Sequence, residues 1–183
     1  MSPFPPDTTS LAAVVALLEQ AGTVEESNEE IPGLTILDHG LQCAALLRGT
    51  DPDDRELQVA GLLHDVGHVL APGCADTHGA VGADYVRPVF GERVADLIDA
   101  HVPAKRYLVT VDRSYRERLS VGSVRSLALQ GEGMSDDEVS EFRATPHFAA
   151  AGRLRWADEA AKDPDDRVPL LGSWLSTLER TAR

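Results

Sequence analysis

Apolar side chains recur every three or four positions along most of the chain, which is the spacing expected of helices that bury one face. The first such run covers residues 10–20, and the second covers 35–48 and ends before Gly49. A third begins at the acidic segment 51–54, which suits the positive end of a helix, and continues to about residue 70. Later helical segments are predicted at 78–90, 91–101, 103–110, 135–144, 146–162 and 168–180. Since no segment shows the alternation of a strand, the pattern predicts an all-α fold.

Length and segment boundaries favour a single domain. A chain of 183 residues is long enough to bury one complete core. We expect one domain over residues 1–183, in which the proline-rich residues 1–9 form a flexible lead. Pro103 is expected to begin a new helix, whereas the segment from Asp112 to Gly133 has no clear pattern. No internal repeat or low-complexity tract divides the chain.

Charge and cysteine content argue against several classes of function. With 17 basic and 30 acidic residues the net charge is −13, which opposes binding to nucleic acid and to anionic membranes. The N-terminus lacks the features of a signal peptide, and nowhere do about 18 uncharged apolar residues run together. Cys43 and Cys74 supply neither a disulfide framework nor a thiolate metal cluster. A reduced, cytoplasmic location is predicted, and a homo-oligomer is compatible with the sequence.

The segment GLLHDVGH, residues 61–68, places three ionisable groups in one of the most apolar runs of the chain. Burying an uncompensated charge is costly, so such groups normally have strong partners, and a metal ion suits all three. His64 and Asp65 are adjacent, about 100° apart on a helix, and can hold one ion that lies between their directions. We interpret Asp65 as part of a metal site or of a buried polar network.

Three further histidines lie at helical positions with apolar neighbours. His39 has Ile36 three residues before it and Cys43 four residues after it, so it is expected to point inward. His78 opens one predicted helix, and His101 closes the next. Taken singly, each has a plainer interpretation, because backbone groups can satisfy both nitrogens of a buried imidazole.

Asp158 lies three residues after Arg155, so the acid and the guanidinium share one helix face. The plainer interpretation is a solvated aspartate that pairs with Arg155, Arg153 or Lys162. Together with the four histidines and Asp65, however, it makes six nitrogen or oxygen donors without a thiolate. Such a set suits Fe, Mn or Zn.

The order of these donors resembles the HD-domain family, in which a histidine, an adjacent His-Asp pair and a final aspartate bind metal. In HD proteins that bind two metals, two more histidines lie between the pair and the last aspartate. This sequence has the whole order in His39, His64, Asp65, His78, His101 and Asp158. The resemblance implies a single helical HD-domain bundle.

Longer strings resemble the HD-domain mixed-valent diiron oxygenases that cleave 1-hydroxyphosphonates of the 2-amino-1-hydroxyethylphosphonate type, which are relatives of myo-inositol oxygenase. The matching strings are LDHGLQCAALL, AGLLHDVGH, HGAVGADYV, HVPAKRYL, LSVGSVRSLALQGEGM and LRWADEAAK. The resemblance implies that the six donors bind two irons as an Fe(II)/Fe(III) pair, with dioxygen as co-substrate. Asp65 would bridge the irons, and Asp65 and His64 are the expected catalytic residues.

The same resemblance implies a small phosphonate substrate that is held by His68, Lys105, Ser123 and Arg155. A protein of net charge −13 needs local donors of this kind to bind an anion. By the sequence alone, Lys105 could equally be a surface lysine, and Ser123 a helix cap. The expected reaction cleaves the C–P bond and releases phosphate and a carboxylate.

One loop departs from the family pattern. Members that act on the aminoethyl substrate carry a tyrosine and a glutamate shortly before the first histidine. Here the loop reads EESNEEIPGLTILDH, which has no tyrosine, and Glu29 and Glu30 are offset from the expected place. A substrate with a methylated amine or with no amine is therefore favoured, unless Glu29 or Glu30 supplies the carboxylate.

Two other classes of function fit the same residues. The first is a two-metal HD phosphohydrolase acting on a nucleotide or phosphate monoester, in which a metal-bound hydroxide attacks phosphorus. It differs from an oxygenase in that it works without oxygen. The second is a metal-stabilised binding domain without turnover, which the predicted anion-binding residues make less favourable.

Overall fold

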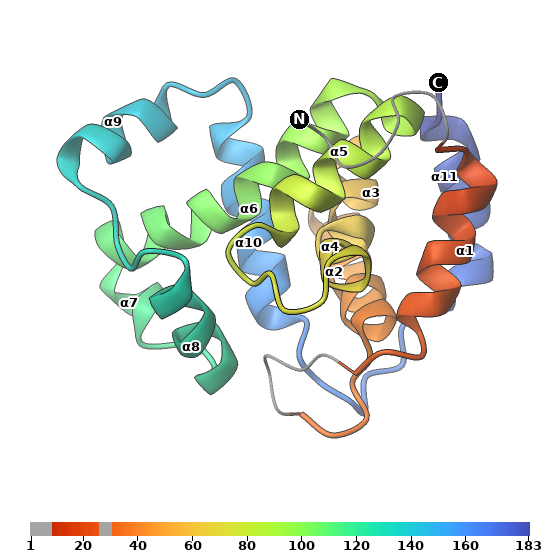
Figure 1. The fold of residues 1–183 in the computed structure, drawn as a ribbon, viewed down its shortest axis with the longest axis horizontal. Coiled ribbons are helices and arrows are strands. Elements are labelled where there is room, and N and C mark those ends of the chain that lie inside the picture. Colours follow the sequence, from red (N-terminus) through yellow and green to blue (C-terminus); the bar gives the residue numbers. More distant parts are fainter. Residues whose placement is uncertain (1–8, 26–30) are drawn as a thin grey trace.

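The computed structural model describes residues 9–25 and 31–183, and these ranges fold into an all-α bundle, as the sequence predicts (Figure 1). In these ranges the β-type pairing is an isolated bridge between Glu25 and Thr35. The helices are α1 (Leu11–Ala21), α2 (Ile36–Thr50), α3 (Arg55–Leu63), α4 (Gly67–Leu70), α5 (His78–Phe90), α6 (Glu92–Val111), α7 (Arg113–Arg116), α8 (Val121–Leu129), α9 (Asp136–Arg143), α10 (Phe148–Ala160), the 3₁₀ turn η1 (Leu171–Ser173) and α11 (Leu175–Thr181).

Side-chain caps fix the starts of several helices where polar residues precede apolar runs. Thr35 caps α2 in a capping box with Asp38, and Ser135 caps α9 in the same way with Glu138. Ser120 caps α8 by accepting the backbone N–H of Ser123. Ser123 is therefore not the cap of its helix, and its hydroxyl is available for another role.

The predicted boundary at Pro103 is wrong. α6 runs unbroken from Glu92 to Val111 through this proline, and it packs along α5 on one side and α10 on the other. A proline inside a helix removes one hydrogen bond but leaves the rest of the ladder, and the packing on both sides holds the helix together. One continuous helix therefore carries both His101 and Lys105.

The helix predicted to continue to about residue 70 is interrupted, which is also a correction. α3 ends at Leu63 and α4 begins at Gly67, with a turn between them. In this turn the backbone N–H of His68 bonds to the carbonyl of Asp65, a spacing of three residues, not four. The segment from Asp112 to Gly133, which has no clear pattern, contains α7 and α8.

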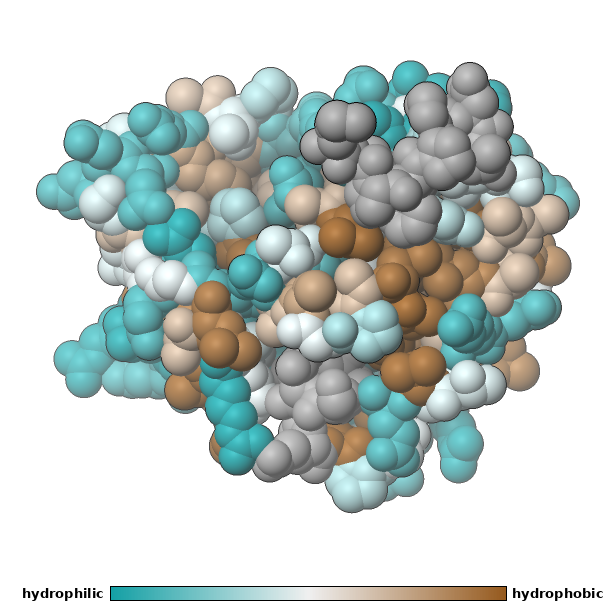
Figure 2. All heavy atoms as spheres, viewed as in Figure 1, coloured by the Kyte–Doolittle hydropathy of each residue, from teal (hydrophilic) through white to brown (hydrophobic). Residues whose placement is uncertain are grey.

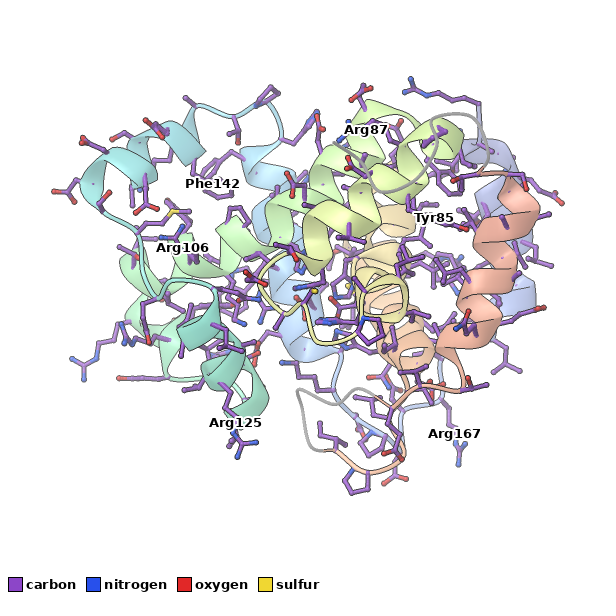
Figure 3. All side chains as sticks on the ribbon, viewed as in Figure 1. Tyr85, Arg87, Arg106, Arg125, Phe142 and Arg167 are labelled. Carbon is purple, nitrogen blue, oxygen red and sulfur yellow. The ribbon has the colours of Figure 1, made fainter. Side chains whose placement is uncertain are left out.

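The core lies between α2, α3, α5, α6 and α10, which pack on one another. α7, α8 and α9 extend to one side of the bundle, far from α1 and α11 (Figure 1). Phe142 on the inner side of α9 packs against Tyr107 of α6 and Phe148 of α10, with ring centroids 5.5 Å from each, and so attaches this extension to the core (Figure 3). The outer end of the extension is hydrophilic (Figure 2).

Among the described residues, no helix combines the length and the apolar character needed to cross a membrane.

Candidate metal centre and cation pocket

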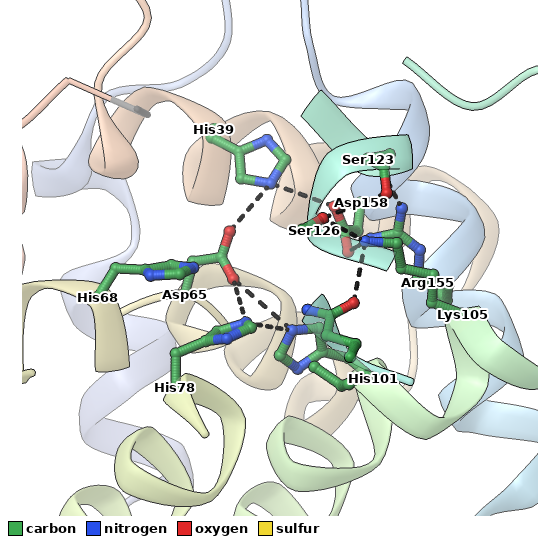
Figure 4. A pocket seen from close by; sticks show the side chains of 12 residues that line it. His39, Asp65, His68, His78, His101, Lys105, Ser123, Ser126, Arg155 and Asp158 are labelled. Carbon is green, nitrogen blue, oxygen red and sulfur yellow. Dashed lines mark hydrogen bonds and ion pairs between the residues drawn. The ribbon is translucent and has the colours of Figure 1, made fainter. Parts of the chain in front are cut away.

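The fold brings the six predicted metal ligands together at the centre of the bundle, and Figure 4 shows all of them except His64. They come from α2, the α3–α4 turn, α5, α6 and α10. All are nearly inaccessible, and the side chain of Asp65 is the most exposed at 13%. We call this set the His/Asp cluster; it consists of His39, His64, Asp65, His78, His101 and Asp158.

Every histidine of the cluster has its Nδ1 atom against a backbone carbonyl oxygen. The Nδ1 to oxygen distances are 2.7 Å for His39 to Ala161, 2.8 Å for His64 to Gly61, 2.8 Å for His78 to Ala75 and 2.5 Å for His101 to Ile98. Because a carbonyl only accepts, each Nδ1 carries a proton, and in the neutral form of each ring the Nε2 atom presents its lone pair. Second partners of this kind are typical of histidines that bind metal.

Asp65 separates these histidines into two pairs. Its Oδ2 atom lies 3.4 Å from Nε2 of His39 and 3.3 Å from Nε2 of His64. Its Oδ1 atom lies 3.3 Å from Nε2 of His78 and 3.7 Å from Nε2 of His101. One carboxylate thus faces two sets of nitrogen donors, which is the arrangement of a bridging ligand.

The nitrogen and oxygen donors of the cluster suit metal ions better than they suit contacts with one another. Nε2 of His78 and Nε2 of His101 lie only 2.8 Å apart, so two lone pairs face each other unless a proton or a metal ion lies between them. Nε2 of His64 is buried without a hydrogen-bond partner among the described residues. Oδ1 of Asp158 lies 3.3 Å from Nε2 of His39, and so adds a second carboxylate to that pair. The chain therefore holds a cluster of imidazoles and carboxylates that suits metal ions: the donor atoms of His39, His64 and Asp65 lie within 4.8 Å of one another, as do those of Asp65, His68 and His78.

Lys105 lies on the wall of the same cavity, one helical turn after His101 on α6. Its Nζ atom donates to Oγ of Ser126 at 2.5 Å and to Oε1 of Gln130 at 3.0 Å. Burial, together with the nearby Arg155 guanidinium, lowers the pKa of Lys105 to about 7. The surface-lysine interpretation is excluded, since the residue is 3% exposed.

Arg155 is fully surrounded by partners on α10 and neighbouring helices. It forms ion pairs with Asp158 and Glu159, donates to the hydroxyl of Tyr115, and lies 3.2 Å from Oγ of Ser123. Although burial opposes it, the Asp158 carboxylate holds the pKa of Arg155 above its ordinary value.

Asp158 in turn links the His/Asp cluster to Arg155, because its Oδ1 faces His39 while its Oδ2 pairs with Arg155. We call Lys105, Ser123, Ser126 and Arg155 the cation pocket.

His68 lies apart from the other predicted substrate residues. Asp65 stands between it and the cation pocket in Figure 4. Its ring stacks on that of His78 with centroids 4.0 Å apart, and burial lowers its pKa to about 4. Its role as a substrate residue stays a prediction, and the predicted roles of Glu29 and Glu30 fall outside the described residues.

Sequence reasoning missed three polar residues around the cation pocket. Ser126 and Gln130 line the cavity, and Glu159 accepts from Arg155 and from the hydroxyl of Ser123 at 2.7 Å. A signal for the first two was present, because residues 123, 126 and 130 have the spacing of one helix face. Glu159 could have been found as the residue four positions after Arg155.

The chain is similar to several known proteins. The model of the HD domain matches residues 36–135. The chain is 39% identical over 155 residues to a hydroxymethylphosphonate dioxygenase of Gimesia maris, which covers 80% of this chain and 77% of the relative. It is 33% identical over 161 residues to a [1-hydroxy-2-(trimethylamino)ethyl]phosphonate dioxygenase (glycine-betaine-forming) of Leisingera caerulea, which covers 84% of this chain and 80% of the relative.

Proposed function

The chain belongs to the HD-domain family, together with these phosphonate dioxygenases, and we propose that it uses dioxygen to cleave the C–P bond of a small 1-hydroxyphosphonate. One substrate and one dioxygen molecule give one carboxylic acid and one phosphate, and both oxygen atoms enter the products. The observation that carries the proposal is a single cavity that joins a carboxylate facing two histidine pairs to a pocket of buried cations.

In this proposal two iron ions occupy the His/Asp cluster. His39, His64 and Asp158 would hold one of them, His78 and His101 would hold the other, and Asp65 would offer one carboxylate oxygen to each. When bound, an Fe(II)/Fe(III) pair would supply one-electron chemistry toward dioxygen without an external reductant. His78 and His101 supply fewer donors than His39, His64 and Asp158, so the site that they form would leave room for the substrate's hydroxyl and a phosphonate oxygen.

The cation pocket binds and orients the phosphonate group. Arg155 donates to Tyr115, Asp158, Ser123 and Glu159, so it can offer the phosphonate the second N–H of Nη1, whereas Lys105 contributes a compact charge. The hydroxyls of Ser123 and Ser126 lie beside them; they donate to Glu159 and to the carbonyl of Ser123, so each has to rotate to donate to the phosphonate. Because Asp158 pairs with Arg155 and also faces His39, the anion and the metals are held in a fixed relation. The burial of the cation-pocket residues keeps bulk water away from the reacting carbon.

The remaining roles follow from position. His68 lies beside His78 and lines the cavity on the side of Asp65 away from Lys105, where it can contact the substrate near its reacting carbon. A cytoplasmic location and a small anionic substrate, without nucleic acid or membrane as partner, complete the proposal. A phosphohydrolase with the same ligands is not favoured, because both of these relatives are named as dioxygenases.

Phosphate release from hydroxymethylphosphonate, measured under air and under strict anaerobic conditions with iron-loaded protein, tests the reaction. We expect release under air, with one dioxygen consumed for each phosphate, and none without oxygen. Equal release in both conditions would replace the oxygenase with the hydrolase. Low-temperature EPR of the partly reduced protein should show a coupled Fe(II)/Fe(III) signal that shifts when the phosphonate is added, and its absence at full iron occupancy would contradict the diiron assignment.

A further inference from the structure

Gln130 contacts both halves of the site, although it belongs to neither. It follows the last residue of α8 and lines the cavity. The backbone then turns away through Gly131 and Glu132, whose φ angles are +95° and +62°. We propose that Gln130 is a positioning residue that holds Lys105 toward the substrate anion and, through the carbonyl of Ala75, holds His78 toward the second metal.

The first contact limits where the Lys105 ammonium can point. An ammonium has three N–H donors, and Ser126 and Gln130 accept two of them at 2.5 and 3.0 Å. The third is the donor available to an anion in the cavity. Without the Gln130 oxygen, the flexible side chain of Lys105 keeps one hydrogen bond instead of two. Its ammonium group is then less firmly oriented toward the cavity.

The second contact reaches the metal side. Nε2 of Gln130 donates to the carbonyl of Ala75 at 3.1 Å, and the same oxygen accepts Nδ1–H of His78 at 2.8 Å. A carbonyl oxygen has two lone pairs, so these bonds occupy both. Gln130 thereby fixes the loop before α5 that sets the orientation of the His78 ring. Ala75 lies 55 residues from Gln130 in the chain, so this contact joins two separate parts of the fold.

One amide group therefore ties an anion-binding residue to a metal-binding residue. The inference deepens the proposed function and rests on it for the identity of the anion and the metals. It predicts two separable effects of removing the amide. Anion binding weakens through Lys105, and the environment of the second metal changes through Ala75.

A double-mutant cycle isolates the first effect. The dissociation constant of inorganic phosphate is measured by calorimetry on metal-loaded protein for wild type, Gln130→Met, Lys105→Met and the double variant. Gln130→Met should weaken phosphate binding about tenfold, the lower end for loss of a supporting residue. In the Lys105→Met background the same change should have less than about a twofold effect. Equal effects in both backgrounds would show that Gln130 does not act through Lys105, and would overturn that part of the proposal.

Low-temperature EPR of iron-loaded, partly reduced protein without substrate isolates the second effect. Gln130→Met should shift the signal of the coupled pair, and the shift should persist when Lys105 is also Met. An unchanged signal would overturn the link to His78. If Gln130→Met does not fold, Gln130→Ala takes its place in both measurements, because its side chain is shorter and adds no new group.

Gln58→Leu is the matched control. Gln58 is also a buried amide that donates to backbone carbonyls, those of Asp51 and Pro52 at 2.8 and 3.1 Å, but it lies outside the cavity. It should leave both phosphate binding and the EPR signal unchanged, even where it lowers thermal stability. Neither readout needs turnover, so a failure of the positioning role is distinguishable from a failure of the proposed reaction.

Discussion

In the His/Asp cluster, three of the four histidines are oriented by a carbonyl only three residues earlier in the chain. In the cation pocket, by contrast, Lys105 depends on partners 21 and 25 residues away, and Arg155 on partners 32 and 40 residues away as well as on its own helix. The tautomer of most cluster histidines is thus a local property, whereas the direction of each pocket cation is a tertiary one. We therefore expect substitutions at distant residues to change the orientation of side chains in the cation pocket more than in the His/Asp cluster.

The two halves also differ in whether their groups mainly accept or donate hydrogen bonds. The cluster presents lone pairs and carboxylates, all of which accept. The pocket presents ammonium, guanidinium and hydroxyl groups, most of which donate. Asp158 is the contact between them, because its two oxygens face opposite sides. A ligand that binds metal through one end and carries a negative charge at the other suits this order.

The largest effect is expected in the cluster itself. Asp65→Asn keeps the shape of the side chain but removes the charge that faces both histidine pairs. Turnover should fall by more than about 100-fold, since even loss of a supporting residue costs up to this much, and iron content should drop below two per chain. Elemental analysis and phosphate release measure the two quantities. Glu117→Gln at the exposed end of α7 is the control. If Asp65→Asn retained both irons and full activity, the bridging role would be refuted.

Two arginines on α10 sharpen the contrast between buried and exposed charges. Arg155→Met removes the buried cation that pairs with Asp158 and Glu159, although Glu159 keeps its ion pair with Lys162, so the unfolding free energy should fall by about 3–5 kcal/mol. Arg153→Met removes an ion pair with Asp51 from a side chain that is 45% exposed, and should cost under about 1 kcal/mol. Urea denaturation of both variants measures the difference. Equal losses would mean that the buried network contributes no more than a surface pair.

Two glycines compare a crowded position with an open one. A Cβ on Gly67 would lie 1.9 Å from the carbonyl oxygen of His78, so α4 and α5 must separate in Gly67→Ala, at a cost of about 1–3 kcal/mol. A Cβ on Gly152 of α10 would meet nothing within 4 Å, and Gly152→Ala should stabilise by up to about 1 kcal/mol. Thermal unfolding should move in opposite directions for the two. A neutral Gly67→Ala would show that the contact between α4 and α5 is not tight.

The smallest effect is a pH dependence that belongs to the cation pocket. Burial lowers the pKa of Lys105 to about 7 in the folded protein, whereas the unfolded lysine keeps its proton up to about pH 10.4. Between these values the unfolded state binds more protons, so this lysine makes stability rise with pH in that window. Between pH 7.5 and pH 8.5 the unfolding free energy of the wild type should rise by about 1 kcal/mol relative to that of Lys105→Met. A constant difference across this range would contradict the lowered pKa.

Much of the fold could be predicted because helical spacing and capping residues are local. Ser10, Thr35 and Ser135 cap the helices whose starts the pattern gives. The errors arose where tertiary packing prevails over a local rule. α6 continues through Pro103 because neighbouring helices hold it, and α3 stops at Leu63 although the apolar run continues. His64 and Asp65 lie in the turn that follows this stop.

The sequence by itself determined the identity of the six cluster residues and the all-α class, because rare polar groups in apolar runs and their order along the chain are visible without coordinates. Only the tertiary structure decided which oxygen of Asp65 faces which histidine pair, and that His68 stands apart from the cation pocket. It also placed Ser126, Gln130 and Glu159 around the two cations. The physical reason is range: donor type and helical phase are fixed within a few residues, whereas the position of a lysine or arginine head group depends on partners that folding brings from distant parts of the chain.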